Sequence, residues 1–120
     1  MSAALNGIWE MIRAESGGEP SSNLAALRVE LHLTATTYEV HFGGELADQG
    51  TYSGAPAETH ATLILCGTKG PNAGRTLPCI YQLVGERLRV CYGLDGSTPT
   101  EFATSPGSSH YLATYRRKAP

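Results

Sequence analysis

Apolar and polar residues alternate most regularly over residues 77–92, where the sequence is LPCIYQLVGERLRVCY. This alternation predicts two strands that fold back at residues 85–86 into an antiparallel hairpin, with Tyr81 opposite Val90. The face predicted to be buried is apolar throughout: Leu77, Cys79, Tyr81, Leu83, Leu88, Val90, Tyr92 and Leu94. The other face carries Arg89 and other polar groups, so a one-residue slip would bury charge, and the register is strongly specified.

A second pair of alternating segments, Arg28–Leu33 and Tyr38–Phe42, predicts another antiparallel hairpin. The predicted register puts the apolar residues on one face and two acid–imidazole pairs on the other: Glu30 with His41, and His32 with Glu39. Such a cluster can be a metal or proton-transfer site, or it can be an exposed ladder of charges. Because the opposite face is apolar and must form the core, we expect an exposed ladder that holds no metal.

Four further segments predict strands: Gly7–Glu15, Asp48–Gly54, His60–Cys66 and Tyr111–Arg117. Residues Ser21–Leu27 predict one or two helical turns. The register of the second of these strands is ambiguous, because either Thr51 or Tyr52 can join its buried face. Eight short antiparallel strands without crossover helices predict an all-β, up-and-down barrel, with residues 1–120 as a single domain. The interior of such a barrel is either filled by side chains or wide enough for one small ligand.

Composition and charge exclude some partners. The chain has 120 residues, 17% of them charged, and a formal net charge of −2. Basic residues cluster only at 116–118, and nucleic-acid phosphates require a concentrated basic surface, so we predict no nucleic-acid partner. No segment approaches the roughly 20 apolar residues that a membrane helix needs, so we predict no membrane partner.

The three cysteines, Cys66, Cys79 and Cys91, form no C-x-x-C motif. The hairpin register puts Cys79 and Cys91 on opposite faces, so we expect no disulfide between them. The first sixteen residues lack the basic and apolar regions of a signal peptide. An odd number of cysteines without an export signal predicts a reduced, cytoplasmic location, with the thiols as small apolar groups rather than metal ligands.

Two glycine-rich loops add further expectations. Gly67–Gly74 contains a lysine, but strands flank it on both sides, whereas a phosphate-binding loop lies between a strand and a helix, so we expect a plain turn. Gly93–His110 is the longest connection in the chain. Because leaving Phe102 in water is costly, we expect this loop to dock on the barrel, with Glu101 paired to Arg89.

A series of short motifs spans nearly the whole chain. In order, they are GxWE from Gly7, YxVxF from Tyr38, GTY from Gly50, GPxxGRTLP from Gly70, IYxL from Ile80, LRVCY from Leu88 and PTEFATSPG from Pro99. The set resembles a family of bacterial lipocalin-like domains of unknown function. The resemblance implies an eight-stranded antiparallel up-and-down lipocalin-like barrel with a short helix after the first strand, and it brings no catalytic residues.

A smaller resemblance concerns the two ends of the chain. Gly7-x-Trp9 near the start, with Arg116 or Arg117 on the last strand, is similar to the lipocalin signature. That similarity implies an arginine lying over the indole at the closed end of the barrel, where a cation–π contact seals it.

Three functions are compatible with such a barrel. The first is binding of a small apolar molecule without a cofactor, in a lumen lined by Trp9, Tyr38, Phe42, Leu63, Tyr81, Val90 and Tyr92. The second is an enzyme of isomerase or cyclase type, whose candidate acid–base groups are Tyr38, Tyr81, Tyr92, Glu10 and His60, although nothing orients one against another. The third is a filled barrel that binds another protein, or its own copy as a homodimer, through strand Ala61–Cys66 or the loop 93–110.

Overall fold

Nine β-strands form one antiparallel sheet in the computed structural model, which describes residues 5–20, 28–55, 61–70, 72–104, 106–107 and 109–118. The strands are β1 (Gly7–Ser16), β2 (Glu19–Pro20), β3 (Val29–Leu33), β4 (Thr37–Phe42), β5 (Glu45–Ala55), β6 (Ala61–Lys69), β7 (Thr76–Val84), β8 (Arg87–Gly93) and β9 (His110–Arg117). The short helix expected at Ser21–Leu27 lies outside the described residues, and no α-helix occurs within them. Nor does the described chain contain a helix long and apolar enough to cross a membrane.

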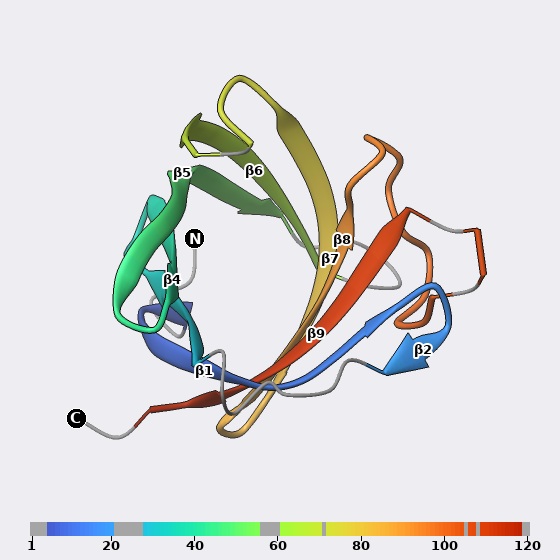
Figure 1. The fold of residues 1–120 in the computed structure, drawn as a ribbon, viewed down its shortest axis with the longest axis horizontal. Helices are drawn as coiled ribbons and strands as arrows, with labels where there is room; N and C mark the ends of the chain where they lie inside the picture. The colour runs from blue at the N-terminus through green and yellow to red at the C-terminus, as the bar shows by residue number, and fades with distance from the viewer. Residues whose placement is uncertain are drawn as a thin grey trace.

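The sheet closes on itself because β1 pairs with β3 along one edge and with β9 along the other. Figure 1 shows this closure, with the first and last strands side by side and the other strands following around the ring in chain order. β2 pairs only with the end of β1, so eight strands make the barrel. The predicted all-β, eight-stranded antiparallel barrel is therefore confirmed.

Both predicted hairpin registers are confirmed. In β7 and β8, Tyr81 lies opposite Val90 and Cys79 opposite Tyr92. In β3 and β4, Leu31 lies opposite Val40 and the other pairs follow as expected. These registers could be predicted because one face of each hairpin is uniformly apolar, and only one alignment buries that face.

Strand β5 differs from its predicted form. It begins at Glu45, three residues earlier than expected, and contains a β-bulge. The pairing passes from Val40 opposite Asp48 to His41 opposite Leu46, which leaves Ala47 as the extra residue. Tyr52, rather than Thr51, packs against the core, and its hydroxyl donates to the exposed Thr34 carbonyl oxygen at 2.6 Å.

One half of the barrel is filled by side chains, and Trp9 is at its centre. The indole is fully buried and its Nε1 donates to the Leu5 carbonyl oxygen at 2.9 Å. The guanidinium carbon of Arg117 lies 4.3 Å from the centre of the indole ring. The arginine expected over the indole is thus Arg117, whereas Arg116 forms an ion pair with Glu10. We call this part, which includes the buried Leu88 of β8, the packed half.

The loop between β8 and β9 docks on the outer wall, as predicted. The ring of Phe102 lies under the Arg89 guanidinium, 4.3 Å from its central carbon, and Pro99 is fully buried. At the end of the loop, Thr104 Oγ1 donates to Glu15 Oε2 at 2.7 Å.

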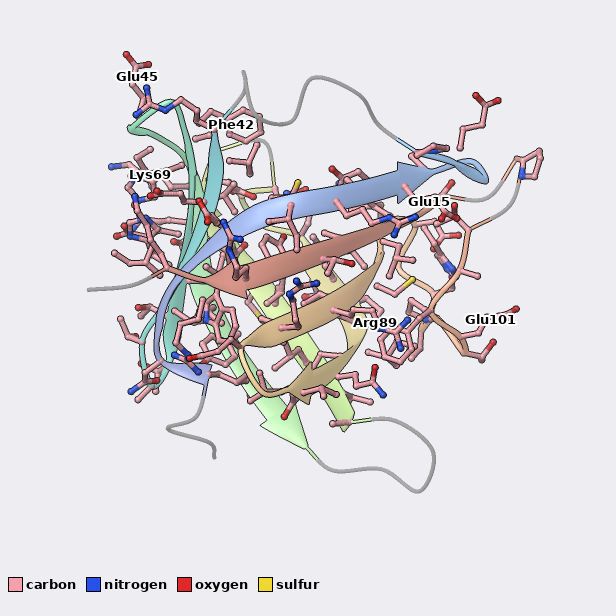
Figure 2. All side chains as sticks on the ribbon, turned by 90° about the horizontal axis from the view of Figure 1, so that it is seen from below. Glu15, Phe42, Glu45, Lys69, Arg89 and Glu101 are labelled. Atoms are coloured by element: carbon pink, nitrogen blue, oxygen red, sulfur yellow. The ribbon has the colours of Figure 1, made fainter. Side chains whose placement is uncertain are left out.

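The expected pair between Glu101 and Arg89 is wrong. Glu101 is exposed and points away from the barrel in Figure 2, and Arg89 instead donates from Nε to Gln82 Oε1 at 3.1 Å. The guanidinium faces the aromatic ring of Phe102, so this part of the loop is held through that contact and not through Glu101.

Candidate functional site

The half of the barrel away from Trp9 contains a cavity of about 770 Å³. This volume lies within the range of roughly 300–1,000 Å³ that is typical of small-molecule sites. Apolar side chains form most of the wall, among them Met11, Val29, Leu31, Val40, Leu65 and Leu77. The polar lining residues are Tyr38, Asp48, Asn72, Tyr92, Tyr111 and Tyr115. The lumen is thus divided between a packed half and an open half.

The seven residues predicted to line the lumen divide in the same way. Tyr38, Phe42 and Tyr92 line the cavity. The others do not line it: Trp9, Leu63, Tyr81 and Val90. Three of these four are buried in the core cluster, and Tyr81 packs against that cluster. The alternation of side chains predicted correctly which residues face inward, but not which of them leave space between them.

The mouth of the cavity has an apolar rim. Phe42 and Leu94 both line the cavity, and both are among the large apolar residues that stay exposed. Figure 2 shows Phe42 and Glu45 close together at the turn between β4 and β5. An exposed apolar rim that continues into an apolar wall favours the passage of an apolar molecule.

Four phenols line the wall, and two of them bond to each other. The hydroxyl oxygens of Tyr92 and Tyr115 are 2.6 Å apart, and the Tyr111 hydroxyl donates to Met11 Sδ at 3.8 Å. Burial is the main cause that raises the pKa of each of these three phenols above its ordinary value. They stay protonated at neutral pH, and therefore act as neutral hydrogen-bonding groups rather than as bases.

Sequence patterns did not predict Asp48 and Asn72 as site residues. Asp48 is only 9% exposed, and its Oδ2 accepts a hydrogen bond of 2.7 Å from Asn72 Nδ2. Asn72 lies in the loop expected to be a plain turn. One signal in the sequence was the ambiguous register of Asp48–Gly54. In a strand whose register is uncertain, an acidic residue such as Asp48 can point either into the barrel or out to solvent.

The candidate acid–base residues are not brought together. Tyr38 and Tyr92 line the cavity, but Tyr81 packs in the other half and Glu10 pairs with Arg116. His60 lies outside the described residues. Among the four that are described, none is hydrogen-bonded to another, so the orientation that a general base needs does not arise from this set.

The four acid–imidazole residues lie on the outer face of β3 and β4, in the predicted register. Their hydrogen bonds, however, run along each strand: His32 Nε2 to Glu30 Oε1 at 2.9 Å, and His41 Nε2 to Glu39 Oε1 at 2.8 Å. The two imidazole rings stack with centres 4.0 Å apart and planes 20° apart. Glu30 also accepts a hydrogen bond from Lys118 Nζ at 2.6 Å, and this contact, followed by the His32 bond, lowers the pKa of Glu30.

One ligand atom from each of His32, Glu39 and His41 lies within 4.8 Å of the others, which is close enough for a metal to be considered. Nitrogen lone pairs lie in the plane of their rings, and two nearly parallel rings cannot direct them at one ion. Tetrahedral coordination would therefore require at least one ring to rotate. The hydrogen bonds from the two histidines to Glu30 and Glu39 would also have to break. We keep the expectation that this cluster is a ladder of charges without a metal.

Changing His32 and His41 together to glutamine should lower the free energy of unfolding by no more than about 1–2 kcal/mol, because both side chains are partly exposed and their bonds are screened. Urea unfolding of the parent and the double variant measures this difference. One equivalent of Zn²⁺ should leave the urea midpoint of the parent unchanged. A zinc-dependent shift of that midpoint that disappears in the double variant would contradict the expectation.

Two of the three thiols agree with their predicted role as buried apolar groups, and for Cys66 the prediction of burial is wrong. Cys79 and Cys91 are buried on opposite faces of the β7–β8 hairpin, and Cys66 is exposed. Burial raises the pKa of Cys79 to about 12 and also raises the pKa of Cys91. Neither buried thiol is therefore a thiolate at neutral pH, and a nucleophilic role for them is not supported.

No family model, no curated protein and no solved structure matches the chain. The function is therefore argued from the cavity and from the residues that surround it.

Proposed function

We propose that this protein binds one small, mainly apolar molecule inside the open half of its barrel. The observation that carries the proposal is the cavity of about 770 Å³, walled mostly by apolar side chains. A stable barrel does not require such a space, because unfilled volume next to apolar walls forfeits packing contacts and costs stability.

The packed half supports the same function by a different route. With Trp9 and Arg117 closing one end, the cavity has a floor, and the exposed rim that includes Phe42 lies away from it. The closed end holds the strands in place without help from a ligand. The open end can then remain accessible without loss of the fold.

The two alternatives have less support. An isomerase or cyclase needs an acid and a base oriented against each other, and the described members of the candidate set form no such pair. An interaction module that uses strand β6 would need a large apolar outer face, and on that face Ile64 is the exposed apolar residue. Membership of the bacterial lipocalin-like domains remains a proposal that rests on the sequence motifs, and a cytoplasmic location one that rests on the cysteines and the first residues. Formation of a homodimer remains a proposal that rests on the apolar residues of strand Ala61–Cys66.

A blocking variant tests the proposal. The protein is titrated with N-phenyl-1-naphthylamine, a neutral probe whose fluorescence rises in apolar surroundings. Val40→Phe adds a ring to the cavity wall and should weaken probe binding about tenfold or more. Val84→Phe makes the same change at an outer position that is 63% exposed and far from the cavity lining, and it should bind the probe as the parent does.

Two results would count against the proposal. The first is the absence of saturable probe binding to the folded parent protein. The second is equal binding by the Val40→Phe and Val84→Phe variants, because the probe would then be bound somewhere other than this cavity.

A further inference from the structure

Two buried polar atoms of residues in the cavity wall have no hydrogen-bond partner among the described residues. Tyr38 is 2% exposed and Asp48 is 9% exposed, and both line the cavity. Within the described part of the chain, neither the Tyr38 hydroxyl nor Asp48 Oδ1 has a hydrogen-bond partner. Buried polar atoms are nearly always satisfied, and leaving one unpaired is costly, more so for a charged group. Two such atoms in one wall of a mostly apolar cavity call for an explanation.

The β-bulge at Ala47 is what turns Asp48 inward. In an uninterrupted hairpin that starts from Phe42 opposite Glu45, Asp48 would face Glu39 on the outer surface. The extra residue shifts the pairing, so Asp48 lies opposite Val40, whose side chain lines the cavity. Bulges often re-aim side chains beside binding and active sites, and this one moves a carboxylate from water into the lumen.

The loop between β6 and β7 holds this carboxylate in place. It passes so close to the bulge that a Cβ on Gly70 would lie 2.5 Å from the Ala47 carbonyl oxygen. Its Asn72 donates to Asp48 Oδ2 at 2.7 Å, which fixes one carboxylate oxygen. The fold therefore places the acid and orients it, as a site with a defined ligand geometry requires.

Within the described part of the chain, Asp48 has no partner in an ion pair. Taking a carboxylate out of water is expensive unless a cation or several hydrogen-bond donors compensate for the lost hydration. Asn72 supplies one neutral donor, so a positively charged donor from outside the chain is the group that fits best.

Tyr38 is the diagonal neighbour of Asp48 on the same inner face, since Tyr38 pairs with Gly50 and Val40 with Asp48. Burial, and then the negative charge of Asp48, raises the pKa of Tyr38 to about 12. Its hydroxyl is therefore protonated at neutral pH, and it can accept a hydrogen bond from a ligand or donate one to it.

We propose that the cavity takes a molecule with a protonated amine at one end and an apolar body, with the amine bound at Asp48 and Tyr38. The body lies against the apolar wall formed by side chains such as Leu31 and Leu77. This inference rests on the proposed function, and it adds the chemical class of the ligand. Charge-assisted hydrogen bonds are about twice as strong as neutral ones, so the amine should decide which apolar molecules bind.

Three ligands of equal chain length test the inference, each as a competitor of N-phenyl-1-naphthylamine at pH 7: octylamine, 1-octanol and octanoate. The parent protein should bind octylamine about tenfold more tightly than octanol, and octanoate most weakly. In Asp48→Asn, the preference for the amine over the alcohol should fall to about threefold or less, while octanol binding stays within about twofold of the parent.

Two further variants make the comparison specific. Glu101→Gln removes one negative charge from an exposed position on the outer loop, and it should keep the preference for the amine. Tyr38→Phe removes only the unpartnered hydroxyl, and it should weaken octylamine binding more than octanol binding. Retained octanol binding in each variant shows that its cavity is still folded.

The outcomes separate the two proposals. If the probe and octanol bind but octylamine is not preferred, or if Asp48→Asn leaves the preference unchanged, the amine inference is overturned and the binding function stands. If an alcohol is preferred and that preference depends on Asp48, the group held there is a neutral donor and the amine inference is again overturned. If neither the probe nor any of the three ligands binds, the proposed function fails, and the inference fails with it.

Discussion

Replacing Trp9 by alanine should lower the free energy of unfolding by about 3–5 kcal/mol, the range measured for the removal of large buried aromatic residues. The indole is 0% exposed, so the substitution loses the full contribution of burying the ring and leaves a void in its place. The substitution also removes the Nε1 bond to the Leu5 carbonyl oxygen and the ring beneath Arg117. A domain of this size is stable by only about 5–15 kcal/mol, so the variant should be near the limit of folding.

Urea unfolding followed by circular dichroism measures this loss. Trp9→Phe keeps most of the buried ring and should cost clearly less than Trp9→Ala. Arg117→Lys keeps the charge and loses the planar guanidinium, so it should cost about 1 kcal/mol. If Trp9→Ala were within about 1 kcal/mol of the parent, the indole would not be the centre of the packed half.

The hairpins could be predicted from sequence because their apolar residues fall on strictly alternate positions. For β7 and β8, alignment of Tyr81 with Val90 is the one register that turns the apolar side chains of one face inward and leaves Arg89 outside. Leu94, predicted to be buried on that face, lies just beyond β8 and is exposed. The docking of Phe102 could be predicted from the cost of exposing an aromatic ring. The loop was correctly expected to contact Arg89. The group that makes this contact is the ring of Phe102, and not Glu101.

The site was harder to predict because it depends on irregular features. A bulge has no period, so alternation could not show that the extra residue at Ala47 turns Asp48 into the lumen. The contribution of Asn72 depends on how a loop folds over a strand far from it in sequence. The open volume is a property of packing in three dimensions, and Trp9 and Tyr38 both face inward although only the second borders the cavity.

Replacing Gly67 by alanine should lower the free energy of unfolding by about 2–4 kcal/mol and also remove the preference for an amine. A Cβ at this position would lie 2.0 Å from the backbone oxygen of Asn72, so the loop must move. Two backbone bonds of the loop would be strained or lost, from Gly67 N to the Arg75 oxygen at 3.0 Å and from Gly74 N to the Gly67 oxygen at 2.9 Å. The bond from Asn72 to Asp48 would be lost with them. Each neutral bond contributes about 0.5–1.5 kcal/mol and a bond to a charged group about 1.5–3 kcal/mol. Because the two backbone bonds are strained rather than fully lost when the loop moves, the expected cost lies in the lower part of their sum.

The measurement combines urea unfolding with the competition of octylamine against octanol. Gly74→Ala is the matched control, because a Cβ there meets no atom within 4 Å and the cost is limited to the left-handed backbone at φ +81°, about 1–2 kcal/mol. Asn72→Ala removes the amide without moving the backbone, and it should weaken the amine preference at a smaller cost in stability than Gly67→Ala. Stability and amine preference equal to the parent in Gly67→Ala would mean that the loop does not hold Asp48. Loss of stability with the preference intact would mean that the carboxylate is positioned by the bulge alone.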